Sequence, residues 1–188
     1  MMFIMPRVNV VMINLLMTAH IVALPCVYAA NDTLEMTATI TKGTCSLSVS
    51  PSVVTFLPPH IVSEFQSGNA VAVAPLDLNY DCTGFLAGTL PSVKLTGETA
   101  TGDANVFLSA PQSQSATGSG FMLKHGEVTQ LVGFYTAGTT WVANGTYALS
   151  SNDQGSEHLT VGFVKQNNAV PVTVGDVNAI LTFTYITP

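Results

Sequence analysis

The side chains that most often perform catalysis or bind metals are sparse in this sequence and form no recognised pattern. Beyond residue 30 the histidines are His60, His125 and His158, and none has the His-x-x-x-His or His-Glu-x-x-His spacing typical of zinc sites. Gly118–Gly120 contains a serine but lacks the Gly-x-Ser-x-Gly sequence of an esterase nucleophile. We therefore predict no catalytic residue, no metal site and no cofactor, and a protein that is not an enzyme.

One pair of carboxylates, Asp77 and Asp81, could in principle serve a glycosidase, which needs two such groups. Both residues belong to Leu76–Cys82, in which apolar and polar residues alternate. Successive side chains of a strand point to opposite faces of its sheet. The alternation therefore places both carboxylates on the polar face, where solvated surface charges are the expected interpretation.

The N-terminal residues 1–29 have the composition of a secretory signal peptide. Val8–Leu24 is almost wholly apolar, and the small residues Val27 and Ala29 suit the −3 and −1 positions of a cleavage site. A membrane anchor is the alternative, but the run is shorter than the roughly 20 residues that a spanning helix needs. Lipidation of Cys26 is disfavoured, because Pro25 stands where a small residue is required. We predict cleavage after Ala29 and export.

Export leaves two cysteines, Cys45 and Cys82, as an even pair. Thiols in an oxidising compartment usually pair, and the spacing is not the Cys-x-x-Cys of a redox site. The sequence therefore predicts a structural Cys45–Cys82 disulfide, which could contribute about 4 kcal/mol by restricting the unfolded chain.

The overall charge excludes some classes of partner. Only 9% of the 188 residues are charged, against about 25% in typical soluble domains, and 11 acidic residues oppose 5 basic ones for a net charge of -6. Nucleic-acid binding requires a basic surface, so no nucleic-acid partner is expected. A surface this poor in charge is more typical of extracellular β-proteins than of helical cytosolic enzymes.

Alternating apolar and polar residues, separated by turn sequences, predict short strands along the exported chain. The longest alternation comprises Val177, Ala179, Leu181, Phe183 and Tyr185. Further strands are predicted at Leu34–Ile40, Ser52–Leu57, Leu76–Cys82, Val93–Thr96, Val106–Leu108, Phe121–Leu123, Val128–Phe134, Tyr147–Leu149 and Leu159–Phe163. Short helical turns near Glu64 or Ser150 are the only helical structure expected. The fold class is therefore all-β, and the spacing of the turns fits a β-sandwich.

The order of several motifs resembles the pilin subunits of chaperone–usher fimbriae, most closely the minor subunits of type 1-like fimbriae. A short alternating arm precedes Gly43–Leu47 (sequence GTCSL), and the second cysteine ends the alternating segment Leu76–Cys82. Gly118–Leu123 (GSGFML) resembles an internal strand of the family, and Val174–Tyr185 resembles its terminal strand. The family usually ends one residue after this tyrosine, whereas three residues follow Tyr185 here.

The resemblance implies an incomplete immunoglobulin-like sandwich (the pilin fold, residues 42–188) with an N-terminal donor-strand arm at residues 30–41 that merges into the first strand. In such a protein the arm of one subunit enters the groove of its neighbour. The resemblance implies Leu34, Met36, Ala38 and Ile40 as the donor residues, although Ala38 stands where donor arms often carry glycine. It implies that Val177, Ala179, Leu181, Phe183 and Tyr185 border the groove that a chaperone or neighbour occupies.

The resemblance also implies the protein's partners and location. They are a periplasmic pilus chaperone, an outer-membrane usher and neighbouring pilin subunits, with passage through the periplasm to the cell-surface fimbrium. The function would be that of a structural subunit that supports bacterial adhesion. Two alternatives remain at this point. One is a glycan-binding tip adhesin, for which Tyr135, Trp141 and Tyr147 could stack on sugars, although such aromatic residues are more often core. The other is a free-standing exported β-sandwich binding module.

Overall fold

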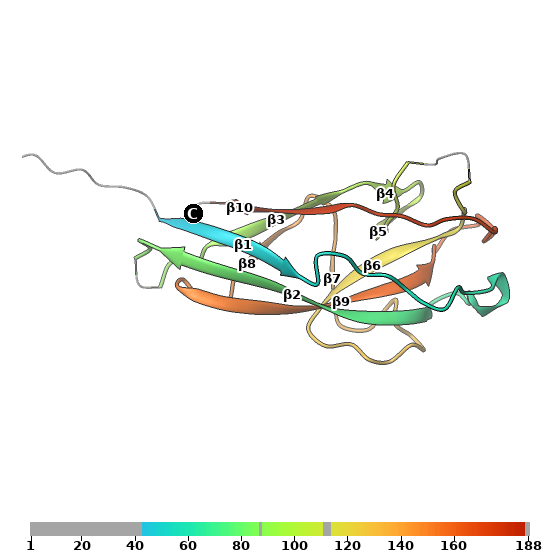
Figure 1. Cartoon of the computed structure of the whole chain (residues 1–188), viewed down its shortest axis with the longest axis horizontal. Coiled ribbons are helices and arrows are strands. Elements are labelled where there is room, and N and C mark those ends of the chain that lie inside the picture. The colour runs from blue at the N-terminus through green and yellow to red at the C-terminus, as the bar shows by residue number, and fades with distance from the viewer. Residues whose placement is uncertain (1–42, 87, 111–113, 187–188) are drawn as a thin grey trace, which may run out of the picture. The chain divides into compact units, whose positions relative to one another are not determined.

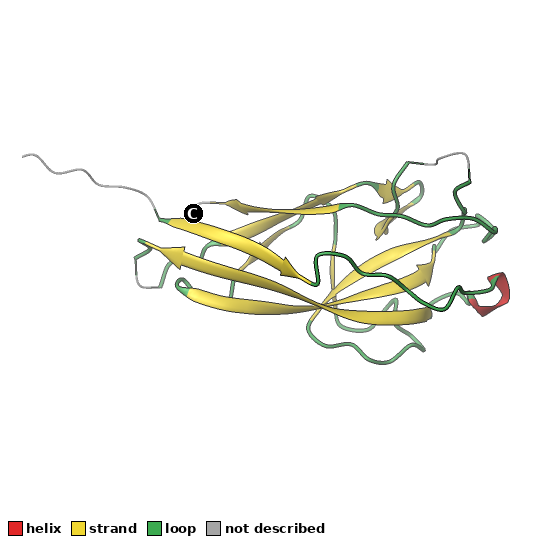
Figure 2. Cartoon of the chain, viewed as in Figure 1, coloured by secondary structure: helices red, strands yellow, loops and turns green. Residues whose placement is uncertain are grey.

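The computed structural model describes residues 43–86, 88–110 and 114–186, all within one compact unit, Thr39–Pro188. The predicted signal peptide at residues 1–29 and the predicted donor arm at residues 30–41 lie outside the described residues. Among the residues described, no helix is long and apolar enough to cross a membrane. Strands form nearly all of the regular structure, as Figure 2 shows, and the all-β prediction is confirmed.

The strands largely follow the alternation in the sequence. Their bounds, with those of one 3-10 turn, are β1 (Thr44–Ser50), η1 (Val62–Glu64), β2 (Ala70–Thr83), β3 (Ser92–Gly97), β4 (Thr99–Ala100), β5 (Asp103–Phe107), β6 (Ser119–His125), β7 (Thr139–Trp141), β8 (Thr146–Ala148), β9 (Gln154–Lys165) and β10 (Leu181–Ile186). The 3-10 turn contains Glu64, near which a helical turn was expected.

These strands form two antiparallel sheets (Figure 1). The larger sheet, sheet A, has the order β1-β2-β9-β6-β5-β4, with β7 also paired to β6. The smaller, sheet B, has the order β10-β3-β8. Thus β1 is an edge strand of sheet A and β10 is an edge strand of sheet B.

The main core lies between the inner faces of the two sheets. Leu78 and Leu159 of sheet A and Val93 and Leu95 of sheet B are at most 2% exposed, and all four belong to one apolar cluster. Asp77, Asn79 and Asp81 alternate with the buried residues of β2 and are at least partly exposed. The alternation of Leu76–Cys82 therefore predicted correctly which side chains face the core.

A second apolar cluster covers the opposite face of sheet A. It includes Met122 and Val164 from the sheet and Phe134 from the loop between β6 and β7. The buried Lys124 belongs to this layer, where its Nζ donates hydrogen bonds to the carbonyl of Tyr135 (2.9 Å) and to Oγ1 of Thr140 (2.7 Å). Burial lowers the pKa of this lysine.

Two predicted strands are wrong. Val128–Phe134 is a loop with turns, because its apolar side chains Val128 and Phe134 pack onto the second cluster instead of alternating within a ladder. Ser52–Leu57 begins with a bend and continues as irregular chain without strand pairing. A strand requires a neighbouring backbone for its hydrogen bonds, and the groove described below separates this segment from β10.

A buried carboxylate joins β9 to its neighbours. Glu157 accepts hydrogen bonds from the amide of Ser150 (2.6 Å) and the hydroxyl of Tyr80 (3.4 Å), and its Oε2 lies 3.2 Å from Nε2 of His125. Burial alone would raise the pKa of Glu157, but the hydrogen bonds from Ser150 and the contact with His125 outweigh burial and hold the pKa below its usual value of 4.5.

Glu157→Gln is therefore expected to destabilise the fold in a pH-dependent way. A carboxyl group whose pKa is lower in the folded state contributes stability above its unfolded pKa and loses it as the pH falls through the folded value. At pH 7 we expect a loss of about 1.5–3 kcal/mol, typical of hydrogen bonds to a charged group. The difference from the unmodified chain should shrink below about pH 4.5.

Urea unfolding at pH 7 and pH 3 measures this difference. Asp81→Asn is the matched control, because Asp81 is an exposed carboxylate of the neighbouring strand β2 and its replacement should change stability by less than about 0.5 kcal/mol. A loss in Glu157→Gln that is equal at both pH values would contradict the prediction.

Candidate functional site

A continuous apolar groove opens between the chain that follows β1 and the chain that leads into β10. Its walls are residues 49–62 and residues 172–183. We distinguish an inner part of about 550 Å³ beside β10 and an outer part of about 680 Å³ beside η1. The two parts are contiguous, because they share the lining residues Val53, Val54, Phe56, Phe121, Val177 and Asn178.

The floor of the groove is the inner face of sheet A. Leu76 from β2, Phe107 from β5, Leu123 from β6 and Val161 from β9 line it. Sheet B has three strands and faces a sheet of seven, so it covers only part of this apolar face. The groove is thus a place where sheet B is too narrow to complete the sandwich.

The two edge strands beside the groove show the same incomplete burial. In β10, Leu181, Phe183 and Tyr185 are half-buried and alternate with the exposed Thr182 and Thr184. In β1, Cys45, Leu47 and Val49 are likewise half-buried between exposed polar residues. Apolar side chains that alternate in this way normally reach full burial in a closed sandwich, so within the described part of the chain neither strand has a neighbour that fully covers these side chains.

The backbone of β10 is also unpaired on the side of the groove. β10 forms its ladder with β3, and no strand among the described residues pairs with its other edge. Earlier in the same wall, Asn178 accepts a hydrogen bond from Ser109, and Asp176 is hydrogen-bonded to Gln114 and Ala116. These bonds attach this part of the wall to Ser109, Gln114 and Ala116. An edge of this kind is a template for an additional strand.

Aromatic rings line the outer part of the groove. The ring of Phe163 lies 5.1 Å from that of Phe121, 5.7 Å from that of Phe56 and 4.9 Å from that of Phe65. His60 packs edge-on against Phe163 at 5.9 Å, and its Nδ1 lies 2.8 Å from Oε2 of Glu64. Four phenylalanines and one histidine therefore gather at this end.

Large apolar side chains stand exposed along both walls. Val53 is 75% exposed on one wall, and Val174 and Ile180 are 90% and 77% exposed on the other. Contiguous exposed apolar surface on a protein usually marks a binding site. The arrangement suits an extended apolar peptide segment.

The structure describes the predicted disulfide and groove-edge residues but not the predicted donor residues. The disulfide joins Cys45 of β1 to Cys82, its direct partner on β2, and this prediction is confirmed. Among the predicted groove-edge residues, Val177, Ala179, Leu181 and Phe183 line the inner part, whereas Tyr185 does not line it and donates a hydrogen bond to the carbonyl of Gly43. Strand structure covers only Leu181–Ile186 of the predicted terminal strand. The donor residues Leu34, Met36, Ala38 and Ile40 lie outside the described residues.

The sequence did not identify the floor or the aromatic end as part of a site. Phe56, Phe121 and Phe163 come from segments far apart in the chain. For Phe121 and Phe163 the sequence predicted strand positions, which is correct, whereas Phe56 lies outside any strand. Only the absence of a covering strand makes them accessible, and no local pattern carries that signal.

The aromatic residues considered for sugar stacking serve the fold instead. Trp141 is only 3% exposed and stacks on Tyr147 with a centroid distance of 4.1 Å. The hydroxyl of Tyr135 donates a hydrogen bond to Asp103 (2.5 Å), and burial raises the pKa of this tyrosine to about 12. Among the described residues, no group of three or more His, Cys, Asp or Glu side chains could hold a metal ion.

Comparisons with known proteins agree with this geometry. The sequence profile described as "Fimbrial protein" matches residues 34–186. The crystal structure of the P pilus rod subunit PapA is 15% identical, with a TM-score of 0.52 over 83% of this chain and 99% of PapA. A chaperone–usher pilus structure that addresses rod uncoiling is 14% identical, with a TM-score of 0.52 over 88% of this chain and 100% of its own. No curated protein matches the sequence significantly.

Proposed function

Because the chain belongs to the fimbrial protein family, we propose that this fimbrial subunit polymerises by donor-strand exchange. In this mechanism, residues 30–41 of one subunit enter the groove of the next as an added strand. A periplasmic pilus chaperone fills the groove beforehand, and an outer-membrane usher receives the subunit for the cell-surface fimbrium. The subunit acts through non-covalent assembly and without turnover.

The observation that carries this proposal is the open groove beside the unpaired edge of β10. Four alternate residues of its wall, Val177, Ala179, Leu181 and Phe183, line the inner part. A strand inserted there would gain main-chain hydrogen bonds from β10 and bury its own alternate side chains against the floor. This combination of an apolar groove and a free strand edge supports a peptide strand as the occupant.

The dimensions of the predicted donor arm fit the inner part of the groove. Leu34, Met36, Ala38 and Ile40 cover six residue steps, which is also the separation between Val177 and Phe183. At about 3.3 Å per residue, each segment extends over roughly 20 Å. The arm therefore offers one apolar side chain for each of the four wall positions. A second copy of this chain can supply a matching occupant.

The proposal can be tested by enlarging Ala38, the smallest of the four donor side chains. Ala38→Phe should slow entry of the arm into a neighbouring groove by about tenfold or more, because overfilling a packed site typically costs about 1–3 kcal/mol. Thr39→Phe is the matched control, since the adjacent residue of a strand points to the opposite face. The measurement is strand exchange between purified chaperone–subunit complexes, followed by native mass spectrometry.

Capture of both variants by the chaperone should remain unchanged, because the groove that the chaperone fills is unaltered. Equal exchange rates for Ala38→Phe, Thr39→Phe and the unmodified arm would contradict donor-strand exchange through these residues. A free-standing binding module would show no exchange in any of the three forms.

A further inference from the structure

Beyond Phe183, the last residue of β10 that lines the groove, three residues contact one another, and we call them the plug: Gly43, Phe85 and Tyr185. The hydroxyl of Tyr185 donates a hydrogen bond of 3.0 Å to the carbonyl of Gly43. The rings of Tyr185 and Phe85 meet edge to face, with centroids 6.1 Å apart. The plug thus joins three parts of the chain: Gly43 just before β1, Phe85 just after β2, and Tyr185 near the end of β10.

Gly43 allows this close approach. A Cβ atom at this position would come within 2.7 Å of the ring of Phe85, so a larger residue would displace the ring. Gly43 is buried although it precedes the first strand, because Phe85 lies directly over it.

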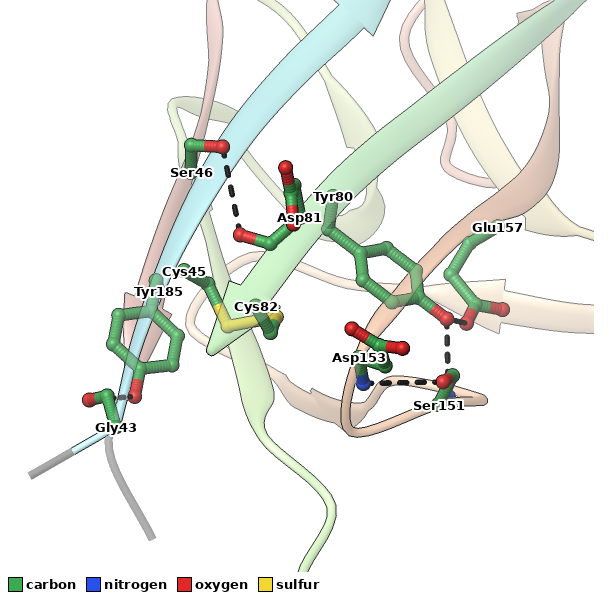
Figure 3. The surroundings of a disulfide bond; sticks show 10 residues. All are labelled: Gly43, Cys45, Ser46, Tyr80, Asp81, Cys82, Ser151, Asp153, Glu157 and Tyr185. Carbon is green, nitrogen blue, oxygen red and sulfur yellow. Dashed lines mark hydrogen bonds between the residues drawn. A yellow bond between two sulfur atoms is a disulfide. The ribbon is translucent and has the colours of Figure 1, made fainter. Parts of the chain in front are cut away.

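The disulfide holds the plug together. Cys45 and Cys82 are direct partners on β1 and β2, and they lie two residues after Gly43 and three residues before Phe85. Figure 3 shows Tyr185 beside this disulfide, with its hydroxyl directed at Gly43. The crosslink therefore fixes the two segments that Tyr185 bridges from β10.

The plug follows the last groove-lining position of the wall that leads into β10. The inward-facing residues of this wall recur at every second position from Val177 to Tyr185. The first four line the inner part of the groove, whereas the fifth, Tyr185, is engaged with Gly43 and Phe85. At the other end the groove continues into the outer part beside His60 and Phe65.

We propose that the plug closes this end of the groove and is a stop that sets the register of the inserted strand, so that four and only four of its alternate side chains lie beside the wall from Val177 to Phe183. This inference rests on the proposed function, and the occupant is the arm of a second copy of this chain. Register otherwise depends only on matching side chains to a groove, because main-chain hydrogen bonds do not distinguish one two-residue shift from the next. A closed end removes that ambiguity.

The sequence of the arm agrees with a site of four positions. The alternation of Leu34, Met36, Ala38 and Ile40 continues to Asp32 on one side and Lys42 on the other. Burying either charge against the apolar groove or the plug would be unfavourable. Arm and groove thus both end after four positions.

Three synthetic peptides test the stop. The first spans residues 33–41. The second spans residues 31–41 with Asp32→Leu, and the third spans residues 33–43 with Lys42→Leu, so that each adds a fifth apolar anchor at one end. The exported chain, with its disulfide intact, is unfolded and then refolded at low concentration with excess peptide. Bound peptide is quantified by native mass spectrometry.

In the unmodified chain, one extended peptide should bind about tenfold tighter than the first, because its extra leucine enters the open outer part of the groove. The other should gain less than about twofold, because the plug blocks its extra leucine. In Tyr185→Ala, and independently in Phe85→Ala, the extended peptide that gains less than twofold in the unmodified chain should instead gain about tenfold. Thr184→Ala, which replaces an exposed residue next to Tyr185, should preserve the asymmetry.

Tighter binding of both extended peptides to the unmodified chain would overturn the stop. So would an asymmetry that persists in Tyr185→Ala and Phe85→Ala. Failure of all three peptides to bind would contradict the proposed function itself, and the stop with it. Two independent plug variants keep the test decisive if one of them does not fold.

Discussion

A chain in which residues 33–41 are repeated after Pro188 through a short flexible linker is expected to fold as a soluble monomer that melts well above the unmodified chain. The repeated segment supplies the strand that the groove lacks. Fully burying side chains such as Leu34, Met36 and Ile40 contributes about 1.5–3 kcal/mol each, and ordering the segment offsets part of this gain. A net gain of about 3 kcal/mol would raise the melting temperature by about 6–12 °C for a domain of this size.

Circular dichroism melts and size-exclusion chromatography measure this effect. The matched control carries Leu34→Asp and Met36→Asp in the repeated segment only, which removes two apolar anchors and leaves the length and linker unchanged. Without the repeat, or with the control repeat, the chain should aggregate or self-associate because its apolar groove and strand edge are uncovered. An unmodified chain that is already monomeric and melts at the same temperature would contradict an incomplete fold.

Loss of the disulfide should have the second large effect. The double substitution Cys45→Ala and Cys82→Ala is expected to lower the free energy of unfolding by about 2–5 kcal/mol. Two causes act together. The crosslink restricts the unfolded chain over a sequence separation of 37 residues, and in the folded chain it holds Gly43 and Phe85 in the plug. Denaturant unfolding and the yield of exported protein measure the loss.

Reduction provides the control for this prediction. A reducing agent should destabilise the unmodified chain by about as much as the double substitution does, and it should leave the substituted chain unaffected. Equal stability of the oxidised and reduced chains would contradict the prediction. Mass spectrometry that finds both thiols free in exported protein would remove its premise.

Local pattern was sufficient to predict many of the elements. Alternation identified the strands around Leu76–Cys82, Leu159–Phe163 and Phe183, and it assigned Asp77 and Asp81 to the polar face. Side chains of a strand alternate with a period of two, so the side that faces the core can be read from neighbouring residues alone. The disulfide followed from an even number of cysteines in an exported chain.

The same reasoning was wrong where an apolar segment has no strand beside it. Val128–Phe134 covers the second cluster as a loop, and Ser52–Leu57 forms a wall of the groove. Whether a segment becomes a strand depends on a second backbone that can lie far away in the sequence. That information is absent from the segment itself.

The groove and the plug arise from packing between distant segments. One end of the groove brings together Phe56, Phe121 and Phe163. The plug brings together Gly43, Phe85 and Tyr185, and the sequence separation between Gly43 and Tyr185 is 142. In sequence, each of these residues resembles an ordinary core or turn residue. Their accessibility depends on how far sheet B extends over sheet A. This extent follows from the strand order of the whole fold, so it cannot be read from any single segment of the sequence.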